Sequence, residues 1–397
     1  MAPPPDKPGQ PPSSIQRSRR KLALHVAVLA LVCALPIIGL ALYFLSSGLE
    51  REIAVAEHER IGLNHVRQSV SVLEKAVRLA WSDTGDDPVM IAELDRALTA
   101  LDEAEASISS TIAPGAPTFT AVPESPHSGS VRSHWQNVKD SEPGSLDRHA
   151  ALRHLTAQLH HGIFQASDRS GLSSGPENEI SALSDVVAVG LPAHVERLLH
   201  MHEVMVPDLR KKGWDDSTRA VAGIFARQLE DEDIRRLSRS INAALTADLR
   251  SAHSVDSFQS GYPTEANALL ASLRQLSAAT QPLESDTAPA TDPEAFDEVL
   301  DSAFEAAVVG WNASIAQLDI LIGDHVSEAV NRRDRAIGIA AICSLALLPL
   351  AWLYFRFFIR PVMQTIIDDA ASHQRDAEAA RAAADESARR LRQTQAA

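Results

Sequence analysis

Cysteine, aromatic residues and positive charge are all scarce in this chain of 397 residues. The two cysteines, Cys33 and Cys343, both lie in long apolar runs, so no disulfide framework is expected in the polar region between them. Aromatic residues make up 5% of the sequence, and alanine is frequent, which favours closely packed helices over a sheet-built domain. A formal net charge of −15 argues against nucleic acid as a partner.

Signatures of catalysis and of metal binding are also missing. The sequence contains no nucleophile elbow, no HExxH helix and no paired-carboxylate pattern. Its histidines lack the i, i+4 spacing of a helical zinc site, because His154 and His161 are two turns apart and His200 and His202 point away from each other. We expect no enzyme, no metal and no cofactor here. Ordinary histidines are favoured over pH sensing, which remains an alternative.

Two apolar runs dominate what is present, at residues 22–45 and 336–355. Each is long enough for a helix to cross the hydrocarbon core of a membrane, which needs roughly 20 apolar residues. We therefore predict two transmembrane helices on either side of a polar region, residues 46–335. For the first run the alternative is a cleaved signal peptide, but the run is long and no small-residue cleavage site follows it.

Basic residues beside the apolar runs predict the orientation, since short cytoplasmic segments of membrane proteins are enriched in lysine and arginine. Such residues precede the first run and follow the second, at Lys7, Arg17, Arg19, Arg20, Lys21, Arg356 and Arg360. Three arginines on the other side of the second run oppose this orientation only weakly, because long domains cross membranes regardless of charge. They are Arg332, Arg333 and Arg335. Both termini are therefore expected in the cytoplasm.

The polar region is predicted to be all-α. Apolar residues follow helical spacing out of the first run, at Leu49, Ile53, Ala56, Leu63, Val66, Val70, Leu73, Val77 and Ala80, and again into the second, at Leu300, Phe304, Ala307, Trp311, Ile315, Leu318, Ile322 and Ala329. The first of these helices should end near Asp83. Two long helices thus connect the region to the predicted spans, and packed together they would form a rigid lever.

Shorter helices and loops fill the rest of the region. One helix should run to about Ser110, and others are predicted at residues 145–168, 177–210, 215–256 with a break near Glu230, and 264–279. Proline-rich stretches near residues 112–130 and 281–293 predict loops. Residues 1–21, which begin with a proline-rich stretch, predict a disordered cytoplasmic leader.

Three segments carry a resemblance to a family. Residues 57–77 resemble the start of the external sensor region of bacterial methyl-accepting chemotaxis receptors, diguanylate cyclases and sensor histidine kinases, with matches at Glu59, Gly62, Leu63, Val66 and Arg67. Residues 167–198 are similar to a later part, with matches at Ser170, Gly171, Leu172, Pro176, Leu191 and Pro192. Residues 222–241 resemble its alanine-rich helix, turn and charged helix. The chain departs from the pattern at His65, Gln68 and residues 77–81.

The resemblance implies a ligand-sensing helical bundle in the periplasm of a Gram-negative bacterium, which is dimeric and lies upstream of an intracellular output. The ligand is unknown, either a small molecule or an envelope protein. Four residues are candidates for lining a pocket only in the generic sense that aromatics and arginines often do so, and packing or surface positions are the favoured alternative: Trp135, Arg153, Trp214 and Arg219.

The tail, residues 356–397, contains no recognisable output domain. Arg360 and Pro361 resemble the opening of a HAMP-type signalling linker, but its connector and second helix are not recognisable. Residues recur every seven positions in a weak coiled-coil pattern, at Met363, Ala370, Ala377, Ala384 and Leu391, with a single solvated helix as the alternative. We predict that this helix carries the signal through Arg360, Pro361 and the seam residues Ala370, Ala377, Ala384 and Leu391.

These patterns predict a dimeric inner-membrane sensor that passes a periplasmic stimulus to a cytoplasmic signalling partner or to an effector beyond residue 397. The output would be of the chemotaxis, two-component or cyclic-di-GMP type. One alternative is an envelope-anchored helical scaffold or assembly protein without a signalling role. Another is a degenerate receptor that has lost its output.

Overall fold

A computed structural model describes residues 14–82, 87–111, 127–173, 178–212, 215–250, 255–280 and 292–361, and parts of 363–381. All regular secondary structure within these ranges is helical, as the sequence predicted. The chain divides into two units. One comprises residues 51–329, which form a helical bundle, and the other comprises residues 1–50 and 330–397.

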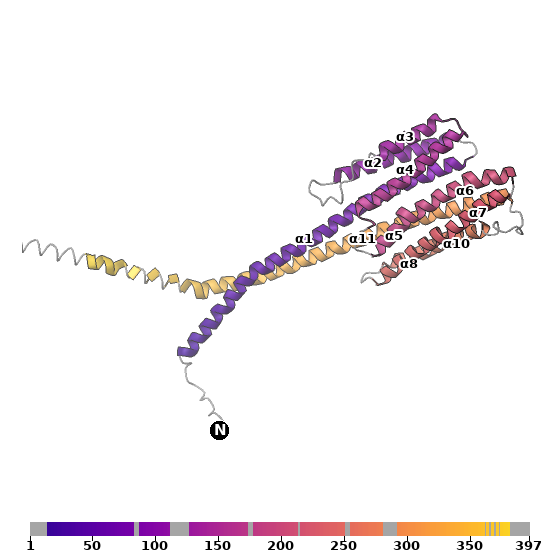
Figure 1. Ribbon diagram of the computed structural model, residues 1–397. Helices are drawn as coiled ribbons and strands as arrows, with labels where there is room; N and C mark the ends of the chain where they lie inside the picture. Colours follow the sequence, from indigo (N-terminus) through magenta and orange to yellow (C-terminus); the bar gives the residue numbers. More distant parts are fainter. Residues whose placement is uncertain are drawn as a thin grey trace, which may run out of the picture. The chain divides into compact units, whose positions relative to one another are not determined.

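The first half of the bundle is built from four helices that lie side by side (Figure 1). They are α1 (Ser14–Trp81), whose residues from Arg51 onward belong to the bundle, α2 (Pro88–Thr111), α3 (His127–Asp140) and α4 (Leu146–Ser170). The ends of α4 follow from its sequence. Ser145 accepts a hydrogen bond from the Arg148 N–H as N-cap, and Gly171 ends the helix at φ 84°, a left-handed conformation that suits glycine.

The second half is built from the remaining helices. They are α5 (Asn178–Asp185), η1 (Val186–Gly190), α6 (Leu191–Lys212), α7 (Asp216–Gln228), η2 (Leu229–Ile234), α8 (Arg235–Arg250), α9 (Asp256–Ser260), α10 (Tyr262–Thr280) and α11 (Pro293–Tyr354), whose residues up to Ala329 belong to the bundle. Both η1 and η2 are π-helical segments inside otherwise continuous helices. The break expected near Glu230 is therefore a π-helical segment, and the chain does not leave the helix there.

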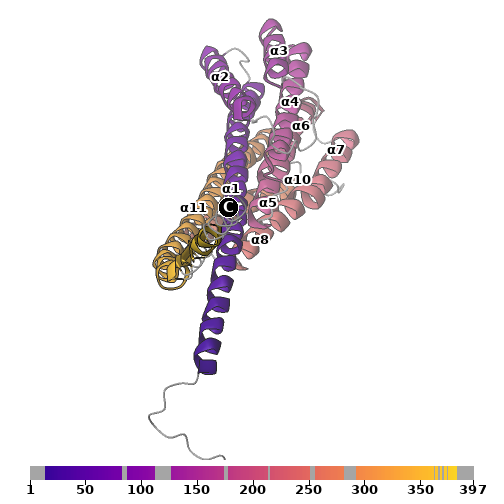
Figure 2. The ribbon, with the colours of Figure 1, turned by 90° about the vertical axis from the view of Figure 1, so that its left-hand side faces the viewer.

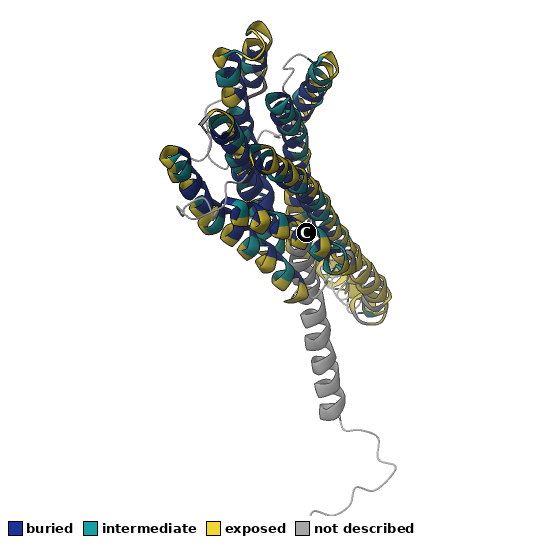
Figure 3. Ribbon diagram, turned by 90° about the vertical axis from the view of Figure 1, so that its right-hand side faces the viewer, coloured by how far each residue is buried: buried dark blue, intermediate teal, exposed yellow. Residues whose placement is uncertain are grey.

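The predicted apolar stripes of the two long helices are buried in the bundle. All eight stripe residues of α11, from Leu300 to Ala329, are at most 2% exposed. On α1 the stripe is buried at Leu49, Ala56, Leu63, Val66, Val70, Leu73 and Val77, while Ile53 and Ala80 are half-buried. Buried residues face inward along the helices of the bundle (Figure 3). These stripes are the main source of packing energy for the long helices.

A row of polar contacts joins the two halves of the bundle along α4, which runs beside α5 and α6 (Figure 2). The contact residues on α4 are seven positions apart and therefore share one face. Ser167 bonds Ser184 at 3.0 Å, His160 bonds Glu196 at 2.8 Å, and Arg153 lies 3.5 Å from Glu203, with each pair measured between side-chain atoms.

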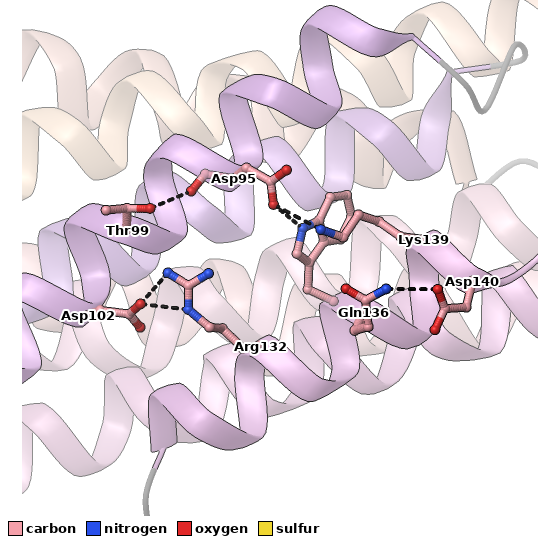
Figure 4. Close-up of polar contacts among 8 residues, drawn as sticks. Asp95, Thr99, Asp102, Arg132, Gln136, Lys139 and Asp140 are labelled. Carbon is pink, nitrogen blue, oxygen red and sulfur yellow. Dashed lines mark hydrogen bonds and ion pairs between the residues drawn. The ribbon is translucent and has the colours of Figure 1, made fainter.

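Helix α3 was not predicted, and its first residues fall inside the loop expected near 112–130, of which residues 112–126 lie outside the described residues. Most residues of this helix are polar, and its buried face is narrow, formed by Val131, Trp135 and Val138. Polar contacts attach this helix to α2 (Figure 4). Asp95 accepts hydrogen bonds from Trp135 at 2.6 Å and Lys139 at 3.3 Å, and Asp102 pairs with Arg132.

The other unit contains the second predicted membrane span. Among the described residues, one helical stretch, Pro293–Cys343, is long and apolar enough to cross a membrane, and half of its apolar window is buried in the protein. Most of this stretch belongs to the bundle, and it overlaps the predicted span only at residues 336–343. Beyond the bundle, large apolar side chains of α11 are exposed, with Ile339 at 61%, Ile342 at 69% and Leu345 at 70%. The first predicted span belongs to α1, but most of its side chains lie outside the described residues.

Gly62→Ala should destabilise the bundle, because a Cβ there would lie 2.1 Å from the Cβ of Ser170 on α4. We expect a loss of about 1–3 kcal/mol, typical of overpacking a core. Gly162→Ala is the control, since a Cβ at this buried helical position meets nothing within 4 Å. It should gain about 0.5–1 kcal/mol from helix propensity. Thermal unfolding of the detergent-solubilised protein measures both changes, and equal effects would contradict the packing.

Candidate functional site: the contacts of helices α1 and α11

Helices α1 and α11 are linked directly by charged side chains within the bundle. Asp319 of α11 lies 3.3 Å from Arg60 and 3.1 Å from Arg67 of α1. Farther along, Glu305 of α11 forms a two-pronged ion pair with Arg78 of α1. The arginines are 36–65% exposed, so each pair contributes at most about 1 kcal/mol. Their value is geometric, because they fix the register of α1 against α11.

Aromatic side chains continue this contact at the end of α1. The ring of Trp81 lies 4.8 Å from that of Phe304 on α11, and the guanidinium of Arg78 lies 5.4 Å from the centre of the Phe304 ring. A cation over an aromatic face is attracted by the ring quadrupole. Trp81 also stacks on His202 of α6, with ring centres 4.9 Å apart. Three helices therefore meet at this end of the bundle.

The π-helical segment η1 connects α11 to the α5–α6 side of the bundle. At the end of η1 the Leu191 N–H bonds the Val186 carbonyl, one residue farther back than in an α-helix. The Val187 carbonyl accepts a hydrogen bond of 2.9 Å from the indole N–H of Trp311 on α11. Pro192 favours the interruption, because it has no N–H for the carbonyl four residues earlier. The backbone group left over by the π segment thus binds α11.

Next to η1, a buried ionic cluster joins α6 to η2. Nδ1 of His194 lies 2.8 Å from Oδ2 of Asp233, and Arg197 donates hydrogen bonds of 3.0 and 3.2 Å to the same carboxylate. Arg197 also bonds Glu232 at 2.7 Å. The side chains of His194 and Asp233 are 0% and 3% exposed. The one-residue insertion of η2 brings both Asp233 and Ile234 to buried positions, and there His194 and Arg197 satisfy the carboxylate.

Electrostatics hold the Asp233 carboxylate in its charged form. Burial raises the pKa of Asp233, but hydrogen bonding to His194 and the charges of His194 and Arg197 outweigh burial and lower it overall. A second pair, between Asp185 at the end of α5 and Arg236 at the start of α8, lies alongside at 2.6 Å. Burial raises the pKa of Asp185 and its bonds with Arg236 and Ser240 lower it, with a net decrease. Both carboxylates therefore fasten α8 and η2 to α5 and α6.

Residues of two segments that carry the family resemblance meet in space. Gly62 of α1 lies against Ser170 at the end of α4, and a side-chain oxygen of Glu59 would lie 3.9 Å from a Cβ at Gly171. Glu59 is only 1% exposed. These positions therefore form a close crossing between α1 and α4. Leu191 and Pro192, from the second segment, lie at the π-helical junction that binds α11.

The predicted signal-transmitting residues of the tail are only partly described. Arg360 and Pro361 are exposed helical residues after a further π segment, η4 (Phe355–Ile359), and Ala377 is exposed on the tail helix. Ala370, Ala384 and Leu391 lie outside the described residues. The coiled-coil seam therefore stays a prediction.

Two of the four residues suggested as pocket lining from the sequence form contacts between helices, and a third lies half-buried on α7. Trp135 is 2% exposed and fastens α3 to Asp95, Arg153 faces Glu203 across the α4–α6 contact, and Arg219 lies half-buried on α7. Trp214 lies outside the described residues. A cavity of about 10 Å³ between α1, α2, α3 and α4 has His65, Ser69, Glu105, Gln158 and Gly162 among its lining residues. That volume is about the size of one water molecule.

No group of three or more potential metal ligands occurs among the described histidines, cysteines and acidic residues. Instead, the rings of His134 and His154 lie 6.0 Å apart, and the His200 ring lies edge-on against Phe225. Sequence reasoning missed His194 and Asp233, since neither belongs to a recognised motif. Two sequence features near these residues could have indicated the cluster. They are the glycine-leucine-proline sequence 190–192 and the acidic sequence 230–233, which disrupts the helical apolar pattern.

No family model, no curated protein and no solved structure matches the chain. The family resemblance of the three segments therefore stays a prediction.

Asp233→Asn should destabilise the protein by about 3–5 kcal/mol near pH 7, because it leaves the buried charge of Arg197 without its main partner. Since the folded protein lowers the pKa of Asp233, its contribution is complete above the ordinary value near 4 and is lost as the pH falls through the folded value. The difference between wild type and variant should therefore shrink in strong acid. Urea unfolding at several pH values measures it.

Asp231→Asn is the control for this experiment. Asp231 is 57% exposed and pairs only with the neighbouring Arg235 on the same helix. Its replacement should change stability by less than about 0.5 kcal/mol. Equal losses in the two variants would show that the buried cluster is not needed.

Proposed function

We propose that the protein is a bacterial inner-membrane sensor that passes a periplasmic stimulus to a cytoplasmic output by displacement of α1 and α11. One observation carries this proposal. Both helices run without a break from the bundle of residues 51–329 into the other unit, α1 through its residues up to Glu50 and α11 through its residues from Val330. A movement of either helix within the bundle is therefore coupled to the residues beyond it.

Exposed apolar side chains support a membrane location for the second part of α11. Ile337, Ile339, Ile342 and Leu345 are 52–70% exposed, at positions that differ around the helix. Such exposure in water costs about 25 cal/mol per Å² of apolar area, and a bilayer removes this cost. Trp352 and Arg356 follow, with the guanidinium 5.8 Å from the ring centre. Aromatic and basic residues commonly anchor helices at the membrane interface.

The contacts of α1 and α11 support transmission of small displacements. Their apolar faces are part of one core, and charged pairs fix their register. Trp311 binds the Val187 carbonyl, so α11 follows the position of η1 and α6. Packed helices of this kind transmit shifts of about 1–2 Å.

The stimulus and the partners belong to the same proposal. The chain would act as a homodimer, receive a small-molecule ligand or an envelope protein in the periplasm, and act on a cytoplasmic signalling partner. The output would be of the chemotaxis, two-component or cyclic-di-GMP type. The scaffold alternative places the same bundle in the envelope as a binding surface without a signal. A scaffold does not require the hydrogen bond between Trp311 and η1, so loss of this bond should impair a sensor and leave a scaffold unaffected.

Topology is tested with single cysteines in a background in which Cys33 and Cys343 are replaced by serine. Asn312→Cys and Ala377→Cys place thiols at exposed helical positions. In intact cells whose outer membrane is permeable to the reagent, a membrane-impermeant maleimide should label position 312 at least tenfold faster than position 377. Lysis should make both reactive. Labelling of position 377 in intact cells would refute the proposed orientation.

Signalling is tested by deleting the gene and restoring it as wild type or as Trp311→Phe. Loss of the indole N–H should weaken the restored chemotaxis, phosphorylation or second-messenger response several-fold while the protein still accumulates in the membrane. The control is Trp135→Phe, which removes a similar indole hydrogen bond to Asp95 between α2 and α3. It should restore the full response. Altered envelope structure with unchanged signalling in the deletion strain would favour the scaffold.

A further inference from the structure

Three helices meet around His202, which belongs to α6. Its ring stacks on Trp81 at the end of α1, with ring centres 4.9 Å apart and planes at 22°. Its Nε2 atom lies 3.5 Å from Oδ1 of Asp297 on α11. The Trp81 ring in turn packs against Phe304 of α11. His202 is therefore wedged between the two helices that run on into the other unit.

The face of α11 beside His202 carries three carboxylates at four-residue spacing: Asp297, Asp301 and Glu305. Like charges at this spacing repel one another on a helix. Arg210 of α6 pairs with Asp297 at 2.8 Å, and Arg78 of α1 pairs with Glu305. For the middle carboxylate, Asp301, the charge that lowers the pKa is that of His202.

Two features of the neighbouring carboxylates would be stabilised by a positive charge at His202. Oδ1 of Asp297 is shielded from solvent but accepts no hydrogen bond from the described residues, although Nε2 of His202 lies nearby. An imidazolium carries N–H on both nitrogens and would donate there. In addition, burial and the charges of Asp297 and Glu305 together raise the pKa of Asp301 despite the opposing charge of His202. A positively charged His202 would donate a hydrogen bond to Asp297 and would offset the negative charge around Asp301.

We propose that His202 is a proton-binding site that tightens the contact of α6 with α1 and α11 when the periplasm is acidic. Protonation places a cation on the face of Trp81 and beside Asp297 and Asp301. The other charges facing the site are Arg78, Arg210 and Glu305, and each of them is already paired. The proton is thus a stimulus, or a modulator of one, for the proposed sensor, and in that respect the inference rests on the proposed function.

Tryptophan fluorescence of the detergent-solubilised full-length protein tests the site between pH 5 and 8. An imidazolium stacked on an indole quenches its emission, so wild type should lose fluorescence as the pH falls. His202→Gln and Trp81→Phe should both abolish this transition. Asp301→Asn should move its midpoint to lower pH by about one unit, because a carboxylate that favours the imidazolium is removed.

His200→Gln is the matched control, since His200 lies on the same helix and contacts the ring of Phe225. It should leave the transition unchanged. Unfolding temperatures of all variants at pH 8 show whether each one folds, and Asp301→Asn retains both the histidine and the indole if either replacement fails to fold. The proposal is wrong if wild type shows no transition, or if folded His202→Gln retains it. Neither result depends on membrane topology or output.

Discussion

The structure depends on the burial of one apolar face along each of two helices that are more than 60 residues long. An isolated helix in water gains little from its own hydrogen bonds, so its persistence requires neighbours that cover its apolar side. All the other helices of the bundle serve this purpose and are much shorter. The long helices are consequently the axis of the bundle, and packing holds them together while the charged pairs between them fix their register.

One cluster of buried polar groups lies where the helices change register. His194, Arg197 and Asp233 lie beside η1 and η2, and Trp311 binds the carbonyl that η1 leaves without its α-helical donor. An ionic cluster of this kind is seldom more stable than apolar residues of the same volume. Its effect is selectivity, because the Asp233 carboxylate meets both His194 and Arg197 only when α6 and η2 pack in this arrangement.

Helical periodicity was sufficient to predict the all-α class, the two long helices and most helix ends within a few residues. It worked at Leu300–Ala329 because an uninterrupted stripe has one interpretation. It failed for α3, whose buried face is only three large residues wide, and for η1 and η2, because a π segment shifts the apolar pattern by one position and resembles a break. The ionic cluster was not predictable, since its members are 39 residues apart and meet only through packing.

A π segment adds one residue to a turn of an α-helix, and this residue changes which neighbours the helix contacts before and after it. The residues before η2 contact α6 and α10, whereas those after it contact mainly α5 in addition to α10. One continuous helix therefore presents two differently oriented faces without a turn or a loop. In evolutionary terms, a single-codon insertion is enough to give such a helix a second neighbour, and its loss would require both neighbours to be repacked together.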